Sequence, residues 1–200
     1  MEIFLKLFLL VYFFLFFLLA VVLPMVRVWS STGNNPLKIG VSDSAHDYTG
    51  KNLFITLFVC ASVIFIFVLS PSVYQALVPI PYLSLIAVVW AGITLLLFAM
   101  IWIPLAQSQM QKSWRIGIDE DVKTELVQRG LFKISRNPIF LGMRVMLFGF
   151  FLILPSAVML ATWVAGELLI QIQVRLEEEF LIRTHGDSYF AYQKKVRRWI

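Results

Sequence analysis

One run of the sequence, Leu7 to Val26, contains no charged residue in twenty positions. A stretch of that length and composition spans a bilayer as a helix, because about 20 residues at 1.5 Å each cover its hydrocarbon core. A cleaved signal peptide is the alternative. The run is long for the apolar part of a signal peptide, and no small-x-small cleavage site follows it before Arg27. We therefore expect a retained transmembrane helix.

Four further apolar runs predict more membrane-spanning helices. They are Leu53 to Ser70, Leu83 to Ala106, Ile139 to Leu154 and Ala157 to Val174. The last two read as a helical hairpin that turns at Pro155 and Ser156, because proline is tolerated at a helix start. Hydrophobic residues make up 60% of the chain and charged residues only 14%, which favours lipid over water as solvent. The expected fold is an all-α polytopic membrane helical bundle with five transmembrane helices.

The basic residues predict the orientation of this bundle. Of the 17 Lys and Arg residues, all but Lys6 and Arg144 lie in segments 27–51, 107–138 and 175–198. Five spans put these three segments on one side, and the positive-inside rule assigns that side to the cytoplasm. We therefore expect an outside N-terminus and a cytoplasmic C-terminus. The net charge of +5 then points to anionic membrane lipids as partners and not to nucleic acid.

Two residues that often carry chemistry have modest predicted roles. Cys60 lies inside an apolar run and has no second cysteine for a disulfide. His46 stands between Asp43 and Asp47 in the polar segment 27–51, which is expected to be a loop connecting two helices. Because no second histidine-type ligand lies near it, we interpret His46 as a solvated loop residue and predict no metal site.

The segment from Gln107 to Pro138 is the least membrane-like stretch of the C-terminal half. Gly130 permits a tight turn, and Pro138 lies where a transmembrane helix is expected to begin. A helix N-terminus has unpaired N–H donors that suit an anionic group, so a ligand site is one reading. An ordinary interfacial loop anchored by Trp114 and Phe132 is the other reading.

Three consecutive glutamates, Glu177 to Glu179, stand near the start of the tail, three residues beyond the end of the last apolar run at Val174. Acidic groups near an anionic lipid surface need a partner, which basic residues or a cationic ligand would supply. A solvated charge run paired with neighbouring arginines is the alternative. Gly186 reads as the helix C-cap. Beyond it, Tyr189 and Tyr192 share one face of an amphipathic helix expected on the membrane surface.

Two charges fall inside the predicted hairpin, Arg144 in one helix and Glu167 in the other. They are equally far along the chain from the turn, so an antiparallel hairpin puts them at the same depth. An unpaired charge at that depth costs at least ~2.5 kcal/mol. We therefore predict that Arg144 and Glu167 form an ion pair, either to lock the hairpin or near a substrate.

The C-terminal motifs together resemble a known family. Leu126-Val127, Gly130-Leu131-Phe132 and Arg136-Asn137-Pro138-Ile139-Phe140-Leu141-Gly142 precede two apolar half-spans. Arg175, Glu177-Glu178, Gly186, Tyr189, Tyr192 and Val196-Arg197 follow. This order is similar to that of the isoprenylcysteine carboxyl methyltransferases and their bacterial and phospholipid-methylating relatives, over about Ser113 to Arg198. The resemblance implies two parts: N-terminal helices in 1–106, and a cofactor-binding region in 107–200.

The family implies S-adenosyl-L-methionine as cofactor, held between the loop and the tail. The positions that carry over as cofactor-binding are Thr124, Glu125, Leu126, Val127, Phe132, Asn137, Pro138, Ile139, Phe140, Glu177 and Glu178. Glu177 would take the ammonium group, and Glu178 would hold a neighbouring arginine or backbone group. Arg144, Glu167 and Gln173 are the candidate substrate residues. No catalytic residue is assigned.

Three departures from the family pattern bear on substrate and mechanism. The family usually has His at Asn137 and Tyr at Phe140, and its eukaryotic members have Arg at Gln173. Asn cannot carry a proton at neutral pH, and the change at Gln173 argues against a prenylcysteine carboxylate. We expect a methyltransferase acting on a small lipophilic or lipid acceptor at the cytoplasmic face. A sterol-reductase-like enzyme using NADPH and a non-catalytic protein retaining the fold are the alternatives.

Overall fold

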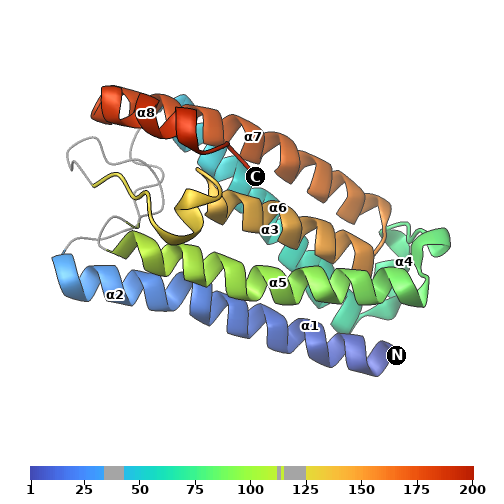
Figure 1. Cartoon of the computed structure of the whole chain (residues 1–200). Helices are drawn as coiled ribbons and strands as arrows, with labels where there is room; N and C mark the ends of the chain where they lie inside the picture. Colours follow the sequence, from blue (N-terminus) through green and yellow to red (C-terminus); the bar gives the residue numbers. More distant parts are fainter. Residues whose placement is uncertain (34–42, 112–113, 115–124) are drawn as a thin grey trace.

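The computed structural model describes residues 1–33, 43–111, 114 and 125–200, and in these residues the chain is all-helical. Five apolar helical runs follow one another in the predicted order and pack side by side as a bundle (Figure 1). The described residues contain no strand, only an isolated bridge between Pro79 and Ser156. The predicted all-α membrane bundle is therefore confirmed.

The first helical run is longer than the predicted span of Leu7 to Val26. It comprises α1 (Glu2–Phe17), a π-helical turn η1 (Leu18–Val22) and α2 (Leu23–Thr32), which continue without a break. Lys6 and Glu2 pair at 2.8 Å one turn apart, so these charges are compatible with the helix start. The run ends at Gly33, which adopts a left-handed conformation with φ of 71°.

The two middle helices are α3 (Ala45–Leu69) and α5 (Ile86–Met110), and they are joined by the short helix α4 (Pro71–Ala76) and the 3₁₀ turn η2 (Pro81–Leu83). Helix α3 begins eight residues before the predicted span, because Ser44 caps it: its hydroxyl accepts from the Asp47 amide at 3.1 Å. The prediction that 27–51 is a loop is therefore wrong for residues 45–51, and also for residues 27–32, which lie in α2.

The hairpin consists of α6 (Pro138–Ile153) and α7 (Ala157–His185), with the turn where it was predicted. The Ser156 hydroxyl accepts from the Met159 amide at 3.2 Å and so caps α7. Helix α7 extends past the predicted end at Val174 and stops at Gly186, the predicted C-cap, which has φ of 53°. Helix α8 (Asp187–Lys195) follows directly.

Four of the helical runs are long and apolar enough to cross a membrane: Glu2–Thr32, α3, α5 and α7. Helix α6 is apolar but has only 16 residues, which at 1.5 Å per residue is about 24 Å, less than the ~30 Å hydrocarbon core. The protein is therefore an integral membrane protein, and the part of the chain that the structure describes holds four helices of spanning length and a shorter fifth one.

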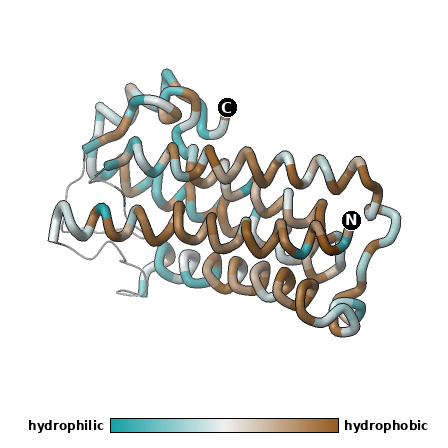
Figure 2. Tube along the Cα trace, turned by 90° about the horizontal axis from the view of Figure 1, so that it is seen from below, coloured by the Kyte–Doolittle hydropathy of each residue, from teal (hydrophilic) through white to brown (hydrophobic). Residues whose placement is uncertain are grey.

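The polar segments gather at one end of the bundle. The end of α2, the starts of α3 and α6, and helix α8 lie at that end, whereas the N-terminus and α4 lie at the other (Figure 1). Hydropathy follows the same division, since the helices are apolar along most of their length and hydrophilic near the loops (Figure 2). The predicted grouping is thus confirmed, and its assignment to the cytoplasm stays a prediction from the charge distribution.

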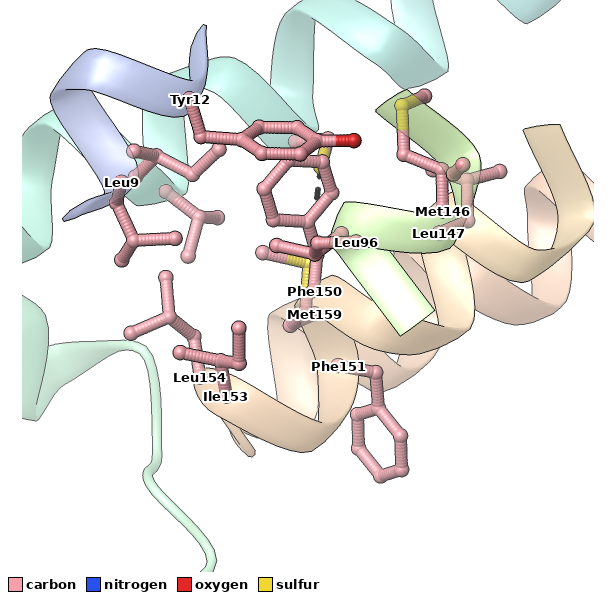
Figure 3. Close-up of a cluster of buried hydrophobic side chains, with 14 of the residues drawn as sticks. Leu9, Tyr12, Leu96, Met146, Leu147, Phe150, Phe151, Ile153, Leu154 and Met159 are labelled. Atoms are coloured by element: carbon pink, nitrogen blue, oxygen red, sulfur yellow. Dashed lines mark hydrogen bonds between the residues drawn. The ribbon is translucent and has the colours of Figure 1, made fainter. Parts of the chain in front are cut away.

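The core of the bundle depends on close contact between α5 and α6. Gly92 and Gly149 face each other there, and a Cβ added at Gly92 would lie 2.9 Å from the Gly149 carbonyl oxygen. Small residues at such positions let two membrane helices approach closely. Nearby, Tyr12 meets Phe150 edge to face with ring centroids 5.5 Å apart (Figure 3). Large apolar side chains such as Phe58 point outward, where lipid is their solvent.

Helix α8 differs from its predicted environment. Its two tyrosines share one face as expected, but Tyr189 and Tyr192 are buried at 1% and 3% exposure. The Tyr192 hydroxyl donates to the Phe132 carbonyl at 2.6 Å. The tyrosine face of the amphipathic tail therefore packs against protein, because the turn around Phe132 and not the membrane surface supplies its partner.

Candidate functional site

A cavity of about 250 Å³ lies at the polar end of the bundle, close to the lower end of the ~300–1,000 Å³ range typical of small-molecule sites. Both halves of the chain line it. The N-terminal half contributes Phe16, Ala20, Val21, His46, Gly50, Leu53, Phe54, Leu57 and Ile103. The C-terminal half contributes Gln107, Met110, Trp114, Phe132, Arg136, Asn137, Pro138, Ile139, Phe140, Met143, Met146, Gln173 and Glu177.

The polar part of the wall comes from two helix segments. Gln173 and Glu177 lie one turn apart on α7, so both present their side chains on one face. Helix α6 contributes its first turn, with Asn137 as N-cap and Pro138 at the first position. The first hydrogen bond of the helix runs from the Leu141 amide to the Asn137 carbonyl, so the preceding N–H groups of Ile139 and Phe140 have no partner within the helix.

Glu178 holds this wall together from behind the cavity. Its side chain is buried and accepts hydrogen bonds from Arg136 at 3.1 Å and from Arg198 at 2.8 Å. The Asn137 side-chain amide donates to it at 3.0 Å. The hydrogen bond to Glu178 also raises the pKa of the Arg198 guanidinium. The start of α6 and the C-terminal tail are therefore fixed to α7 through one carboxylate.

A short 3₁₀ turn, η4 (Gly130–Lys133), holds Phe132 against the cavity. Gly130 has φ of 59°, the left-handed conformation that glycine adopts without strain. The next amide, of Leu131, donates to the Gln109 side-chain oxygen at 2.7 Å. Together with the Tyr192 hydrogen bond, this contact sets the position of the Phe132 ring.

The structure brings together seven of the residues predicted for the site. They line one cavity and are Phe132, Asn137, Pro138, Ile139, Phe140, Gln173 and Glu177. Glu178 lies directly behind them and holds two arginines, the role that the sequence suggested for it. The predicted proximity of the loop, the helix start and the tail is thus observed.

Other predicted residues lie elsewhere. Glu125 is exposed and Leu126 and Val127 are half-buried, and none of the three lines the cavity. Thr124 lies outside the described residues. Arg144 and Glu167, predicted as substrate residues, do not line the cavity either. They form the predicted ion pair, with Arg144 Nε 2.7 Å from Glu167 Oε2.

The prediction of His46 as a solvated loop residue is wrong. It lies in the first turns of α3, is 7% exposed and lines the cavity. Its Nε2 is 2.6 Å from the Gln173 side-chain nitrogen. The signal was present in the sequence, because positions 46, 50, 53 and 57 follow the helical spacing of a single buried face.

Gln107, Met110 and Trp114 are further lining residues that the sequence did not single out as ligand contacts. Gln107 is one helical turn beyond Ile103 on the same face of α5, and Trp114 is 4% exposed. Within the described parts of the chain, no group of three His, Cys, Asp or Glu side chains is placed to hold a metal ion.

These features define a polytopic helical membrane protein with an internal cavity at one end of its bundle. The chain belongs to the DUF1295 family, described as "protein of unknown function", which it matches over residues 41–196. This family belongs in general to the membrane superfamily of steroid 5-alpha reductases and isoprenylcysteine carboxyl methyltransferase-like proteins. No curated protein matches the sequence. The matched region contains every described lining residue except Phe16, Ala20 and Val21.

Proposed function

We propose that this protein is a membrane methyltransferase that uses S-adenosylmethionine and acts on a small lipophilic acceptor at the cytoplasmic face. One observation carries the proposal. The Glu177 side chain and the first turn of α6 line the same cavity as several aromatic rings. These are the groups that a molecule with an ammonium, a carboxylate and an aromatic base requires.

The residues of this wall fit the cofactor group by group. Glu177 would hold the ammonium through a charge-assisted hydrogen bond. The N–H groups of Ile139 and Phe140 would hold the carboxylate, as helix N-termini hold anions. The rings of Phe132 and Phe140 would stack on the adenine or face the sulfonium.

When bound, S-adenosylmethionine supplies an electrophilic methyl group, so the protein contributes mainly placement. Holding two reactants in line is worth at best ~7–11 kcal/mol of the barrier. Asn137 serves this placement indirectly, since its amide donates to Glu178 and fixes the start of α6. Because Asn is not ionisable, we assign it no part in proton transfer.

The acceptor would reach the cavity from the lipid. Four apolar residues line the cavity from the first helical run and from α3, and together we call them its apolar arm: Phe16, Val21, Phe54 and Leu57. Phe54 also has 45% of its surface exposed, so this arm reaches the outer face of the bundle. A lipophilic molecule would enter along this arm, while a polar cofactor would enter at the hydrophilic end (Figure 2).

The superfamily also includes reductases, so NADPH is the competing ligand. NADPH carries several phosphates, which proteins bind with free arginines and lysines. Among the described lining residues Arg136 is the one Arg or Lys, and its guanidinium is already bonded to Glu178 and to the Val196 carbonyl. The charge of the wall therefore favours the methyl donor.

Calorimetry on the detergent-solubilised full chain tests the proposal. We expect S-adenosylhomocysteine to bind and NADPH not to bind. Glu177→Ala should weaken S-adenosylhomocysteine binding by about 10- to 100-fold, the worth of a charge-assisted hydrogen bond. Glu179→Ala is the matched control, because Glu179 is exposed and does not line the cavity.

Three results would overturn the proposal. Binding of NADPH without S-adenosylhomocysteine would assign the protein to the reductases. Binding of neither would favour a non-catalytic member of the family. Equal losses in Glu177→Ala and Glu179→Ala would remove Glu177 from the site.

A further inference from the structure

Two side chains that line the cavity have buried amide oxygens without a hydrogen-bond partner among the described residues. They are Oε1 of Gln107 and Oε1 of Gln173. The two side chains come from different helices, line the same cavity, and are 7% and 5% exposed. A buried polar atom left without a partner destabilises the folded state, so two in one cavity wall indicate a ligand that donates hydrogen bonds to them.

The side-chain nitrogen of each glutamine already has a hydrogen-bond partner. Gln107 Nε2 donates at 2.9 Å to the Ala20 carbonyl, which lies within the π-helical turn η1. Such turns in a helix often occur at functional sites. Gln173 Nε2 lies 2.6 Å from His46 Nε2. Because an amide nitrogen cannot accept, the histidine nitrogen accepts here, and His46 orients the Gln173 amide.

We infer that Gln107 and Gln173 form the recognition subsite for the polar head of the methyl acceptor, and that this head donates hydrogen bonds to their amide oxygens. This inference rests on the proposed function and specifies its substrate class. The head is then an amine, whose N–H groups suffice for both oxygens, or a hydroxyl group, whose single hydrogen satisfies one of them, on a lipophilic chain. A carboxylate is excluded because it has only acceptor oxygens, which would face two more acceptors.

The subsite also distinguishes substrate from product. Transfer of the sulfonium methyl group to a hydroxyl gives a methyl ether, S-adenosylhomocysteine and one proton released to solvent, and the ether has no hydrogen to donate to the amide oxygens. A hydroxyl acceptor is therefore held more tightly than its methylated form, which favours product release into the lipid.

Competition binding to the full chain in lipid nanodiscs tests this inference with four probes of one chain length: dodecylamine, 1-dodecanol, dodecyl methyl ether and dodecanoate. Affinities are expressed per mole fraction of probe in the bilayer. We expect the amine and the alcohol to bind about ten-fold more tightly than the ether or the carboxylate, the ratio that 1.4 kcal/mol gives. Equal affinity of all four, tighter binding of dodecanoate, or binding of none overturns the inference.

Substitutions of the two glutamines test whether their amide oxygens cause the preference among the probes. Gln107→Met and Gln173→Met keep the side-chain length and remove the acceptor, so each should reduce the preference for the amine, which can donate to both oxygens, over the ether to about three-fold or less. Gln171→Met is the control on the same helix, because the Gln171 amide bonds to Glu167 and Arg175 and does not line the cavity. A preference unchanged in both lining variants overturns the inference. If neither variant folds, the wild-type ranking of the four probes decides alone.

The two proposals fail differently. S-adenosylhomocysteine binding together with equal affinity for the alcohol and the ether would overturn the subsite and leave methyl transfer standing. Absence of S-adenosylhomocysteine binding together with the expected ranking would overturn methyl transfer. The cavity would then be a site for lipophilic donors of another activity.

Discussion

The guanidinium of Arg144 lies 2.7 Å from the carboxylate of Glu167, at matching depths on the two helices of the hairpin. The same guanidinium stacks over the Trp199 ring, with its central carbon 4.3 Å from the ring centre. A single cation thus joins α6, α7 and the C-terminal tail. Each of the two charged side chains is less than a third exposed, so their attraction is only partly screened.

The first prediction concerns this ion pair. Arg144→Ala or Glu167→Ala leaves one charge without its oppositely charged partner in an apolar bundle. Each should lower the free energy of unfolding by about 1–3 kcal/mol, between the values for exposed and buried pairs. The double variant should lose less than the sum of the single losses, which denaturant unfolding in detergent will measure. Additive losses would show that the two charges do not stabilise each other.

The second prediction separates two adjacent glutamates. Glu178 is buried and bonded to Arg136 and Arg198, so Glu178→Ala leaves two guanidinium groups unpaired. We expect a loss of about 3–5 kcal/mol in the free energy of unfolding. Glu179→Ala, at an exposed position one residue on, should change it by no more than about 0.5 kcal/mol. Similar losses in the two variants would contradict the role of Glu178 as an anchor.

Much of the architecture was predictable because the signals are local. A charge-free apolar run demands a membrane helix wherever it falls, and the turn at Pro155 and Ser156 fixes the hairpin register. That register is why the pair of Arg144 and Glu167 could be placed from sequence alone. Gly186 was identifiable as the end of α7 for the same reason, since helix termination depends on a few neighbouring residues.

The cavity was less predictable because it depends on contacts between distant segments. His46 lies among polar residues in the sequence. It belongs to α3 because Ser44 caps the helix just before it, and a cap of this kind does not change the hydropathy of the segment. The orientation of the Gln107 side chain depends on its hydrogen bond to the Ala20 carbonyl, which is 87 positions away in the sequence. The resemblance that found Glu177 and Asn137 also suggested Glu125 to Val127, which do not line the cavity.

The third prediction concerns alkaline pH. Burial raises the pKa of Tyr192 to about 12, against about 10 for an unfolded tyrosine. Below about pH 10 both states keep the proton, and the contribution to stability is complete. Between about pH 10 and 12 only the unfolded state loses its proton, so stability falls by up to about 1.4 kcal/mol per pH unit.

Tyr192→Phe should remove this part of the pH dependence. It should also cost about 1 kcal/mol near neutral pH, because the hydrogen bond to the Phe132 carbonyl is lost. Burial also raises the pKa of Tyr189, so a weaker alkaline slope should remain in the variant. Unfolding followed from pH 8 to 12 measures both effects. An unchanged slope between pH 10 and 12 would show that Tyr192 titrates alike in the folded and unfolded states.

The fourth prediction concerns the apolar arm of the cavity. Leu57 lines it from α3, so Leu57→Trp should fill the space assigned to the lipophilic acceptor. S-adenosylhomocysteine affinity should stay within about two-fold, because the groups assigned to the cofactor lie on η4, α6 and α7. The rate of methyl transfer to acceptors present in a lipid extract should fall at least about ten-fold, because the reacting groups lose their alignment. Phe58→Trp is the matched control, since Phe58 is the next residue and is 73% exposed toward lipid. If both variants keep full transfer activity, the acceptor does not occupy this arm. If Leu57→Trp alone loses cofactor affinity, the arm belongs to the cofactor instead.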